Sequence, residues 1–170
     1  MSLMESKTCP RIVIAGTSGD SGKTLVSLGL LAGLRQRGYK VAAFKKGPDY
    51  IDPAWLNAAS GGLVRNLDTF LVDERKVRQT FSRYAVESGM NIIEGNRGLY
   101  DGLDAQGSHS TAELAKLLEA PIILVCNVTK STRTVAAIVL GMKEMDQNTN
   151  IAGVILNQVG GKRHKDFLTN

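Results

Sequence analysis

The stretch that most constrains the fold of this chain is a glycine-rich segment between a short apolar run and a run with helical spacing. It reads Gly16-Thr17-Ser18-Gly19-Asp20-Ser21-Gly22-Lys23-Thr24. A strand that ends in glycines and turns into a helix directs unpaired backbone N–H groups at one point, where the helix dipole adds positive potential. Lys23 can place a cation on the β- and γ-phosphates, and the Thr24 hydroxyl can bind Mg²⁺. The segment therefore predicts a phosphate-binding loop, and every residue in it is a candidate nucleotide-binding residue.

The spacing of this loop differs by one residue from the strict pattern G-x-x-x-x-G-K-[ST]. Thr17 stands where that pattern has its first glycine, and Gly16 lies one residue earlier, so the loop is one residue longer. The alternative is an ordinary glycine-rich turn with a chance lysine. The order of apolar run, glycines, Lys-Thr and helical run favours the phosphate loop.

The length and composition indicate one globular domain. The chain has 170 residues, of which 43% are hydrophobic and 22% charged, enough to bury a single core. Because Met4 suggests a later native start, we expect residues 1–10 to be a disordered N-terminal extension and residues 11–170 to be the P-loop ATP-binding domain. No apolar run approaches the roughly 18 residues of a membrane helix, and the N-terminus lacks an apolar signal core. We therefore expect a cytoplasmic protein with no membrane partner.

The charge and the cysteine content argue against nucleic-acid binding and against cysteine-based chemistry. The net charge is +5, but the basic residues are scattered and aromatic residues are few, which favours an anionic small-molecule substrate over nucleic acid. Cys9 and Cys126 show neither CxxC spacing nor a histidine partner, so we interpret both as structural thiols.

Hydrophobic periodicity predicts alternating strands and helices. We expect strands at 12–15, 41–44, 90–93, 121–126 and 151–156, and helices at 25–34, 73–88, 111–118 and 132–146. The opening βαβ unit implies right-handed crossovers between parallel strands. The predicted fold is α/β of the P-loop NTPase type, with a mostly parallel central sheet flanked by helices on both faces.

Polar residues gather where the second predicted strand ends, on the sheet edge where open α/β folds bind ligands. Lys45 and Lys46 end the strand, and the turn-rich segment 47–53 follows with two carboxylates. We assign function to Asp49, which directly follows the lysines and a Gly-Pro turn. Asp52 precedes Pro53, and we interpret it as a turn former or helix N-cap.

Three later residues are further candidates at this edge. Glu94 ends the third apolar run, where P-loop enzymes place a carboxylate that holds or orients Mg²⁺. Arg97 could contact an acidic substrate or phosphate, or simply be solvated. Asn157 ends the fifth predicted strand, where its amide can hydrogen-bond a base edge or form a turn.

Taken together, these blocks resemble one family. They are the loop 16–24, Phe44-Lys45-Lys46-Gly47-Pro48-Asp49-Tyr50-Ile51-Asp52-Pro53, Asn66-Leu67-Asp68, the segment 94–102 with Glu94-Gly95 and Gly98-Leu99-Tyr100-Asp101-Gly102, and Gly153-Val154-Ile155-Leu156-Asn157. From about Arg11 onward the chain is similar to the ATP-binding domain of the cobyrinic acid a,c-diamide synthase family. It resembles dethiobiotin synthetase more distantly.

The resemblance implies an ATP-dependent amidoligase that phosphorylates a side-chain carboxylate of a corrin-type tetrapyrrole, after which ammonia displaces the phosphate. It implies ATP and Mg²⁺ as cofactors. Lys23 and Thr24 would hold phosphates and Mg²⁺, and Glu94 and Asp49 would complete the metal site. Lys45 would neutralise the transferring γ-phosphoryl, and Asn157 would read adenine. Lys23, Lys45 and Asp49 are thus the expected catalytic residues.

Two departures from the family leave alternatives open. The family continues into a glutaminase domain with a cysteine nucleophile, so we expect this chain to be the N-terminal part of a longer protein that takes ammonia from glutamine. The polar pair Asn96-Arg97 stands where the family has apolar residues, which leaves sirohaem or another sirohydrochlorin-derived macrocycle open as the substrate. An ATP-binding domain without catalysis is another class, as is a deviant-Walker partitioning ATPase, although Ser18 replaces its early lysine. Assembly as a homodimer is also open.

Overall fold

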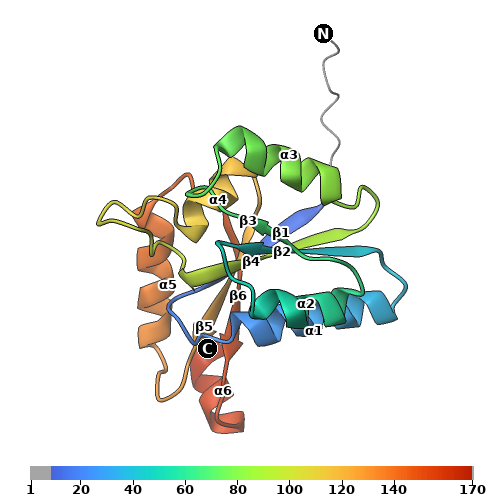
Figure 1. Cartoon of the computed structure of the whole chain (residues 1–170). Helices are drawn as coiled ribbons and strands as arrows, with labels where there is room; N and C mark the ends of the chain where they lie inside the picture. The colour runs from blue at the N-terminus through green and yellow to red at the C-terminus, as the bar shows by residue number, and fades with distance from the viewer. Residues whose placement is uncertain (1–8, 170) are drawn as a thin grey trace.

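The computed structural model describes residues 9–169, and it contains one six-stranded sheet in the order β3-β2-β4-β1-β5-β6 (Figure 1). The strands are β1 (Arg11–Gly16), β2 (Val41–Lys46), β3 (Arg65–Leu67), β4 (Met90–Gly98), β5 (Ile122–Asn127) and β6 (Ile151–Asn157). The helices are α1 (Lys23–Gln36), α2 (Asp52–Ser60), α3 (Glu74–Tyr84), α4 (Thr111–Leu117), α5 (Thr134–Met145) and α6 (Lys162–Thr169). Every paired strand is parallel to its neighbour, so all the carboxyl ends lie along one edge.

Helices cover both faces of this sheet, as the sequence predicts (Figure 1). On the face of α1 and α2, Leu31 and Leu56 pack with Ile92 and the other strand residues of one apolar cluster. On the opposite face, α3, α4 and α5 pack against Ile93 and its neighbours in a second cluster. Because successive strand residues point to opposite faces, adjacent residues such as 92 and 93 serve different clusters. The expected α/β fold of the P-loop type is confirmed.

Cys9 and Pro10, which the sequence assigns to the extension, pack against the described domain. Cys9 is buried in the core, and the Pro10 carbonyl accepts hydrogen bonds from the Asn91 backbone N–H (3.0 Å) and side-chain Nδ2 (2.8 Å). The remainder of the expected extension, residues 1–8, lies outside the described residues.

Three elements and one strand length differ from the sequence predictions. The segment 47–53 contains the start of α2, because Pro53 occupies its first turn, where a missing N–H costs no helical hydrogen bond. Strand β3 and helix α6 are not among the expected elements, because β3 is too short to show alternation and α6 has no buried face. Strand β4 continues to Gly98, so Glu94 lies within the strand and not at its tip.

The remaining helices, α1, α3, α4 and α5, lie where the sequence predicts helices, and both cysteines are buried. No helix within residues 9–169 has the length and apolar character that crossing a bilayer would demand. Cys126 is fully buried in β5, and burial raises the pKa of its thiol to about 11. Such a thiol stays protonated and unreactive at neutral pH, which fits a structural role.

Candidate active site

The phosphate-binding loop connects β1 to α1 and depends on two of its glycines. Gly22 has φ +96°, in the left-handed region that favours glycine, and α1 begins at the next residue. A Cβ atom on Gly22 would collide with Nδ2 of Asn157, and one on Gly16 would collide with Oγ of Ser21. The loop therefore has its tight path because these positions carry no side chain, and its exposed tip runs through Ser18, Gly19 and Asp20.

Lys23 lies folded back over this loop. Its Nζ donates a hydrogen bond to the Ser18 carbonyl at 3.0 Å, and only 8% of the residue is exposed. Burial, followed by the repulsion from Lys45, lowers the pKa of Lys23 below its ordinary value. No carboxylate within residues 9–169 forms an ion pair with this ammonium, so Lys23 remains available to an incoming phosphate.

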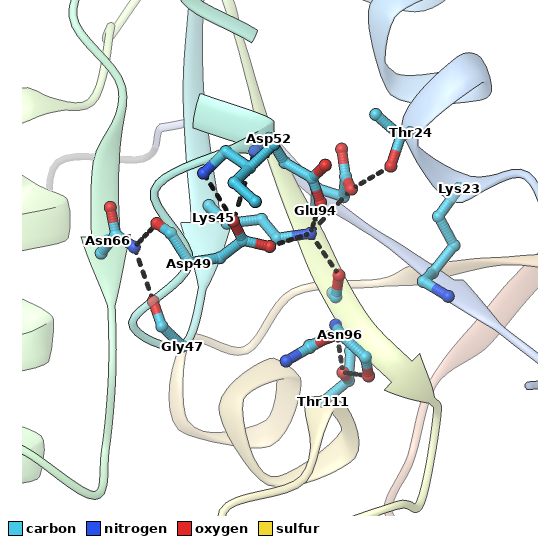
Figure 2. Close-up of polar contacts among 12 residues, drawn as sticks. Lys23, Thr24, Lys45, Gly47, Asp49, Asp52, Asn66, Glu94, Asn96 and Thr111 are labelled. Carbon is cyan, nitrogen blue, oxygen red and sulfur yellow. Dashed lines mark hydrogen bonds and ion pairs between the residues drawn. The ribbon is translucent and has the colours of Figure 1, made fainter. Parts of the chain in front are cut away.

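Lys45 lies at the centre of a buried polar cluster (Figure 2). Its Nζ donates to Oδ2 of Asp52 at 2.7 Å, to Oε1 of Glu94 at 2.8 Å and to the Gly95 carbonyl at 3.2 Å. Burial alone would lower the pKa of Lys45, but Glu94 and Asp52 outweigh it and raise the pKa above its ordinary value. The side chain is therefore a fixed ammonium ion at the carboxyl edge of the sheet.

Glu94 joins this cluster to the phosphate loop. Its Oε1 also accepts a hydrogen bond of 2.7 Å from the Thr24 hydroxyl, which comes from the first turn of α1. The other oxygen, Oε2, is buried and has no hydrogen-bond partner among the described residues. A buried oxygen of this kind costs free energy unless a cation or donor satisfies it.

The oxygen atoms of this cluster are of the kind that Mg²⁺ binds. Glu94, the Thr24 hydroxyl and Asp52 offer hard oxygen ligands, which this ion prefers. Within residues 9–169 no group of three or more histidine, cysteine or acidic side chains is arranged to hold a metal alone. Mg²⁺ does not require such a group, because it usually takes most of its ligands from phosphates and water.

The two carboxylates of the β2–α2 segment make contacts that differ from those that the sequence suggests. Asp49 Oδ1 accepts hydrogen bonds from the backbone N–H groups of Ile51 (2.9 Å) and Asp52 (3.2 Å), and its Oδ2 is 3.8 Å from Lys45 Nζ. Burial would raise the pKa of Asp49, but these backbone bonds outweigh it and lower the pKa. Asp49 thus shapes the start of α2, while Asp52 makes the short contact with Lys45. Only the long-range packing of α2 against the sheet could have distinguished them.

Asn157 ends β6 beside the loop. Its Nδ2 donates to the Ser21 carbonyl at 2.9 Å, so the residue contacts the nucleotide-binding loop directly. The Ser21 side chain is fully buried, and its hydroxyl has no hydrogen-bond partner in the described part of the chain. Adenine recognition by Asn157 remains a prediction.

The segment after β4 is tied to the same loop. The Leu99 N–H donates to the Gly16 carbonyl at 2.8 Å, and the Gly98 N–H donates to Oδ2 of Asp101 at the same distance. The structure therefore brings the loop 16–24, Lys45, Glu94 and Asn157 to one sheet edge.

A loop of this geometry, with a lysine over it and a threonine paired to a strand carboxylate, defines a P-loop nucleotide-binding protein. The sequence comparison is more specific. The profile of the CobQ/CobB/MinD/ParA nucleotide binding domain family matches residues 12–170, and the chain belongs to this family.

Several relatives carry one name. The chain is 48% identical over 163 residues to the cobyrinate a,c-diamide synthase of Syntrophotalea carbinolica, covering 95% of this chain and 36% of that protein. It is 50% identical over 159 residues to the enzyme of the same name from Dehalococcoides mccartyi strain CBDB1, covering 93% and 34%. The chain thus spans about a third of the length of these relatives.

Solved structures share the fold at low sequence identity. The kinase domain of Escherichia coli tyrosine kinase ETK superposes with a TM-score of 0.54 at 18% identity, over 94% of this chain and 71% of that one. Chloroplast FtsY from Physcomitrella patens gives 0.56 at 16% identity, over 91% and 51%. These likenesses support the P-loop architecture alone.

Proposed function

We propose that this chain is the ATP-dependent half of a tetrapyrrole amidoligase of the cobyrinate a,c-diamide synthase type. A carboxylate oxygen of the acceptor attacks the γ-phosphorus, and the bond from phosphorus to the β,γ-bridging oxygen breaks to release ADP. Ammonia then attacks the acyl carbon, the carbon–oxygen bond to phosphate breaks, and amide, phosphate and a proton result. Two-step activation of this kind needs positioning and charge neutralisation more than covalent help.

The residues at the sheet edge supply those two requirements. The loop N–H groups and Lys23 would hold the phosphates, and Lys45 would bind the negative charge shared between γ-phosphoryl and acceptor carboxylate. Thr24, Glu94 and Asp52 would hold Mg²⁺, with Asp49 positioning Asp52 through the backbone bonds of α2. When bound, the ion would neutralise charge on the β- and γ-phosphate oxygens.

The nitrogen source and the assembly are part of the proposal. The relatives' greater length is consistent with a glutaminase partner domain that supplies ammonia. Free ammonium salts would then replace glutamine in an assay of this chain alone. We place the reaction in the cytoplasm, where ATP and Mg²⁺ are abundant, and leave a homodimer to measurement by sedimentation.

The single observation that carries the proposal is the buried ammonium of Lys45, which lies between Asp52 and Glu94. Glu94 also accepts a hydrogen bond from Thr24 of the phosphate loop. The test is ADP release with Mg·ATP and ammonium chloride, with and without cobyrinic acid, and trapping of the acyl phosphate as a hydroxamate with hydroxylamine. Acceptor-dependent ADP and hydroxamate are expected, and both should disappear in Lys23→Ala and Lys45→Ala. Lys40→Ala, at the exposed amino end of β2, is the matched control. ADP release that ignores every tetrapyrrole acid would contradict the proposal.

A sirohydrochlorin-derived macrocycle is a second candidate acceptor, favoured by the polar pair Asn96-Arg97. Parallel assays with both macrocycles separate the two, since the preferred acceptor has the higher kcat/KM. A partitioning ATPase is disfavoured because Ser18 stands where such proteins carry a lysine, and Ser18 donates its hydroxyl to the Gly19 carbonyl at 2.8 Å. Nucleotide-dependent dimerisation without any acceptor would revive that class.

A further inference from the structure

Two cations lie beside the Lys45 cluster, and the proposed chemistry does not use them. Lys46 ends β2 and Arg97 lies near the end of β4, the neighbouring strand. Lys45 is paired in register with Glu94. Because side chains alternate along a strand, Lys46 leaves β2 on the face opposite to Lys45. The two cations therefore border the site from the other side of the sheet.

Neither cation is neutralised by a close partner. Lys46 is partly buried and Arg97 is exposed, and neither side chain forms a hydrogen bond or ion pair with residues 9–169. Burial lowers the pKa of Lys46, with Arg97 and Lys45 acting in the same direction and Asp68 opposing them. Asp68 directs Oδ1 to the backbone N–H groups of Phe70 and Leu71. Two like charges near each other, neither of them in a close ion pair, favour the binding of an anion.

The backbone at Arg97 supports a functional origin. Its φ is +50°, in the left-handed region that a glycine adopts at lower cost than arginine. Strained non-glycine residues persist where the surrounding structure and the function require the side chain. The arginine is thus kept at a position where glycine would serve the fold better.

We propose that Lys46 and Arg97 bind a carboxylate of the acceptor other than the one being phosphorylated. This inference rests on the proposed function. The relatives are named for a diamide product, so an acceptor of that kind carries at least two carboxylates. While one is presented to the γ-phosphate, the arginine fork can hold another in bidentate geometry. The pair would thereby select a polycarboxylic acid and fix which carboxylate reacts.

The phosphates of ATP are the other source of the same anionic chemistry. They are less suited to this pair, because Lys23 and the loop N–H groups are the proposed ligands of the phosphates, and Lys46 lies on β2 and outside that loop. Kinetics separate the two sources, since an acceptor subsite changes the KM of the acceptor and a phosphate subsite changes the KM of ATP.

The test uses steady-state ADP release with ammonium chloride for wild type, Lys46→Met, Arg97→Gly and Arg97→Lys. Loss of a charge-assisted contact should raise the acceptor KM about tenfold or more in Lys46→Met and Arg97→Gly. The ATP KM should stay within about twofold, and Arg97→Lys should retain part of the affinity. Lys40→Met removes the same charge from the other end of β2 and should change neither constant.

The Arg97→Gly variant separates binding from a structural role. It relieves the left-handed strain, so its thermal unfolding temperature should rise while its acceptor affinity falls. An unchanged acceptor KM in both variants, or an equal rise in the ATP KM, would overturn the inference. Failure of the proposed function looks different, because wild type itself would then release no ADP in response to acceptor, and both proposals would fall together.

Discussion

Nζ of Lys45 lies 2.8 Å from Oε1 of Glu94, while Oε2 of the same carboxylate is buried and has no hydrogen-bond partner within residues 9–169. One oxygen is therefore committed to the protein's own ammonium and to Thr24, and the other is free for a cation. The carboxylate can serve the lysine and a metal ion together without giving up either contact. A substitution of Glu94 should therefore change both the stability of the fold and the ATP-dependent activity.

Glu94→Gln should lower both the free energy of unfolding and the rate of ADP release. The side chain is 1% exposed, and removing one partner of a buried ion pair costs about 3 kcal/mol of unfolding free energy, toward the low end because Asp52 remains. ADP release should fall at least about 100-fold if Mg²⁺ loses this ligand. Denaturant unfolding and steady-state turnover measure the two effects. Glu119→Gln is the control, since its 4.0 Å pair with Arg11 is largely exposed and should be worth about 1 kcal/mol or less. Unchanged turnover in Glu94→Gln would remove the residue from the metal site.

Asp52→Asn should reduce turnover more than Asp49→Asn. Asp52 Oδ2 is 2.7 Å from Lys45 Nζ, whereas Asp49 Oδ2 is 3.8 Å away. We expect about tenfold or more loss in kcat for Asp52→Asn, because a charge-assisted hydrogen bond becomes a neutral one. Asp49→Asn keeps an oxygen for the backbone bonds that start α2, so its effect should be smaller. The two variants are matched in chemistry, and a larger loss in Asp49→Asn would restore the ranking that the sequence suggested.

The sequence predicted the fold class and most of the residues that the structure brings together at the sheet edge, and the differences have a common cause. The phosphate loop, Lys45 and Glu94 could be found because each depends on local order, a strand followed by a polar residue. The contact of Asp52 with Lys45 depends on how α2 packs beside the sheet, which no local pattern encodes. Strand β3 has three residues, and its pairing with β2 is tertiary. Asp49, the metal ligand that the sequence predicts, lies three residues before Asp52, which makes the short contact with Lys45.

Gly22→Ala should weaken nucleotide binding, while Gly19→Ala should not. Gly22 has φ +96°, and an added Cβ would collide with the Asn157 amide, whereas nothing lies within 4 Å of a Cβ on Gly19. We expect at least about tenfold weaker Mg·ATP binding for Gly22→Ala by calorimetry, with a loss of about 1–3 kcal/mol in unfolding free energy. Equal behaviour of the two variants would mean that the loop rearranges on binding and that the left-handed turn is dispensable.

The unfolding free energy should fall as pH rises from 9 toward 11, in part because of Cys126. Burial raises the pKa of this thiol from 9.0 to about 11. Below pH 9 both states are protonated, and above it the unfolded state ionises first, so the native state loses up to about 1.4 kcal/mol per pH unit. Other groups also titrate here, so the measured quantity is the difference in pH slope between wild type and Cys126→Ala. A slope that the substitution leaves unchanged would contradict the raised pKa.

Asn157→Ala should weaken ATP binding more than GTP binding. Nδ2 of Asn157 carries two hydrogens, and one is donated to the Ser21 carbonyl, which leaves the other hydrogen and Oδ1 for a base. Such an amide can pair with the N7 and N6 atoms of adenine, whereas guanine presents O6 in place of the amino group. We expect the ATP KM to rise about tenfold, with the GTP KM nearly constant. Asn157→Asp, which keeps the acceptor and loses the donor to Ser21, separates the two contacts. A rise that is equal for both nucleotides would show that Asn157 acts only by holding the phosphate loop.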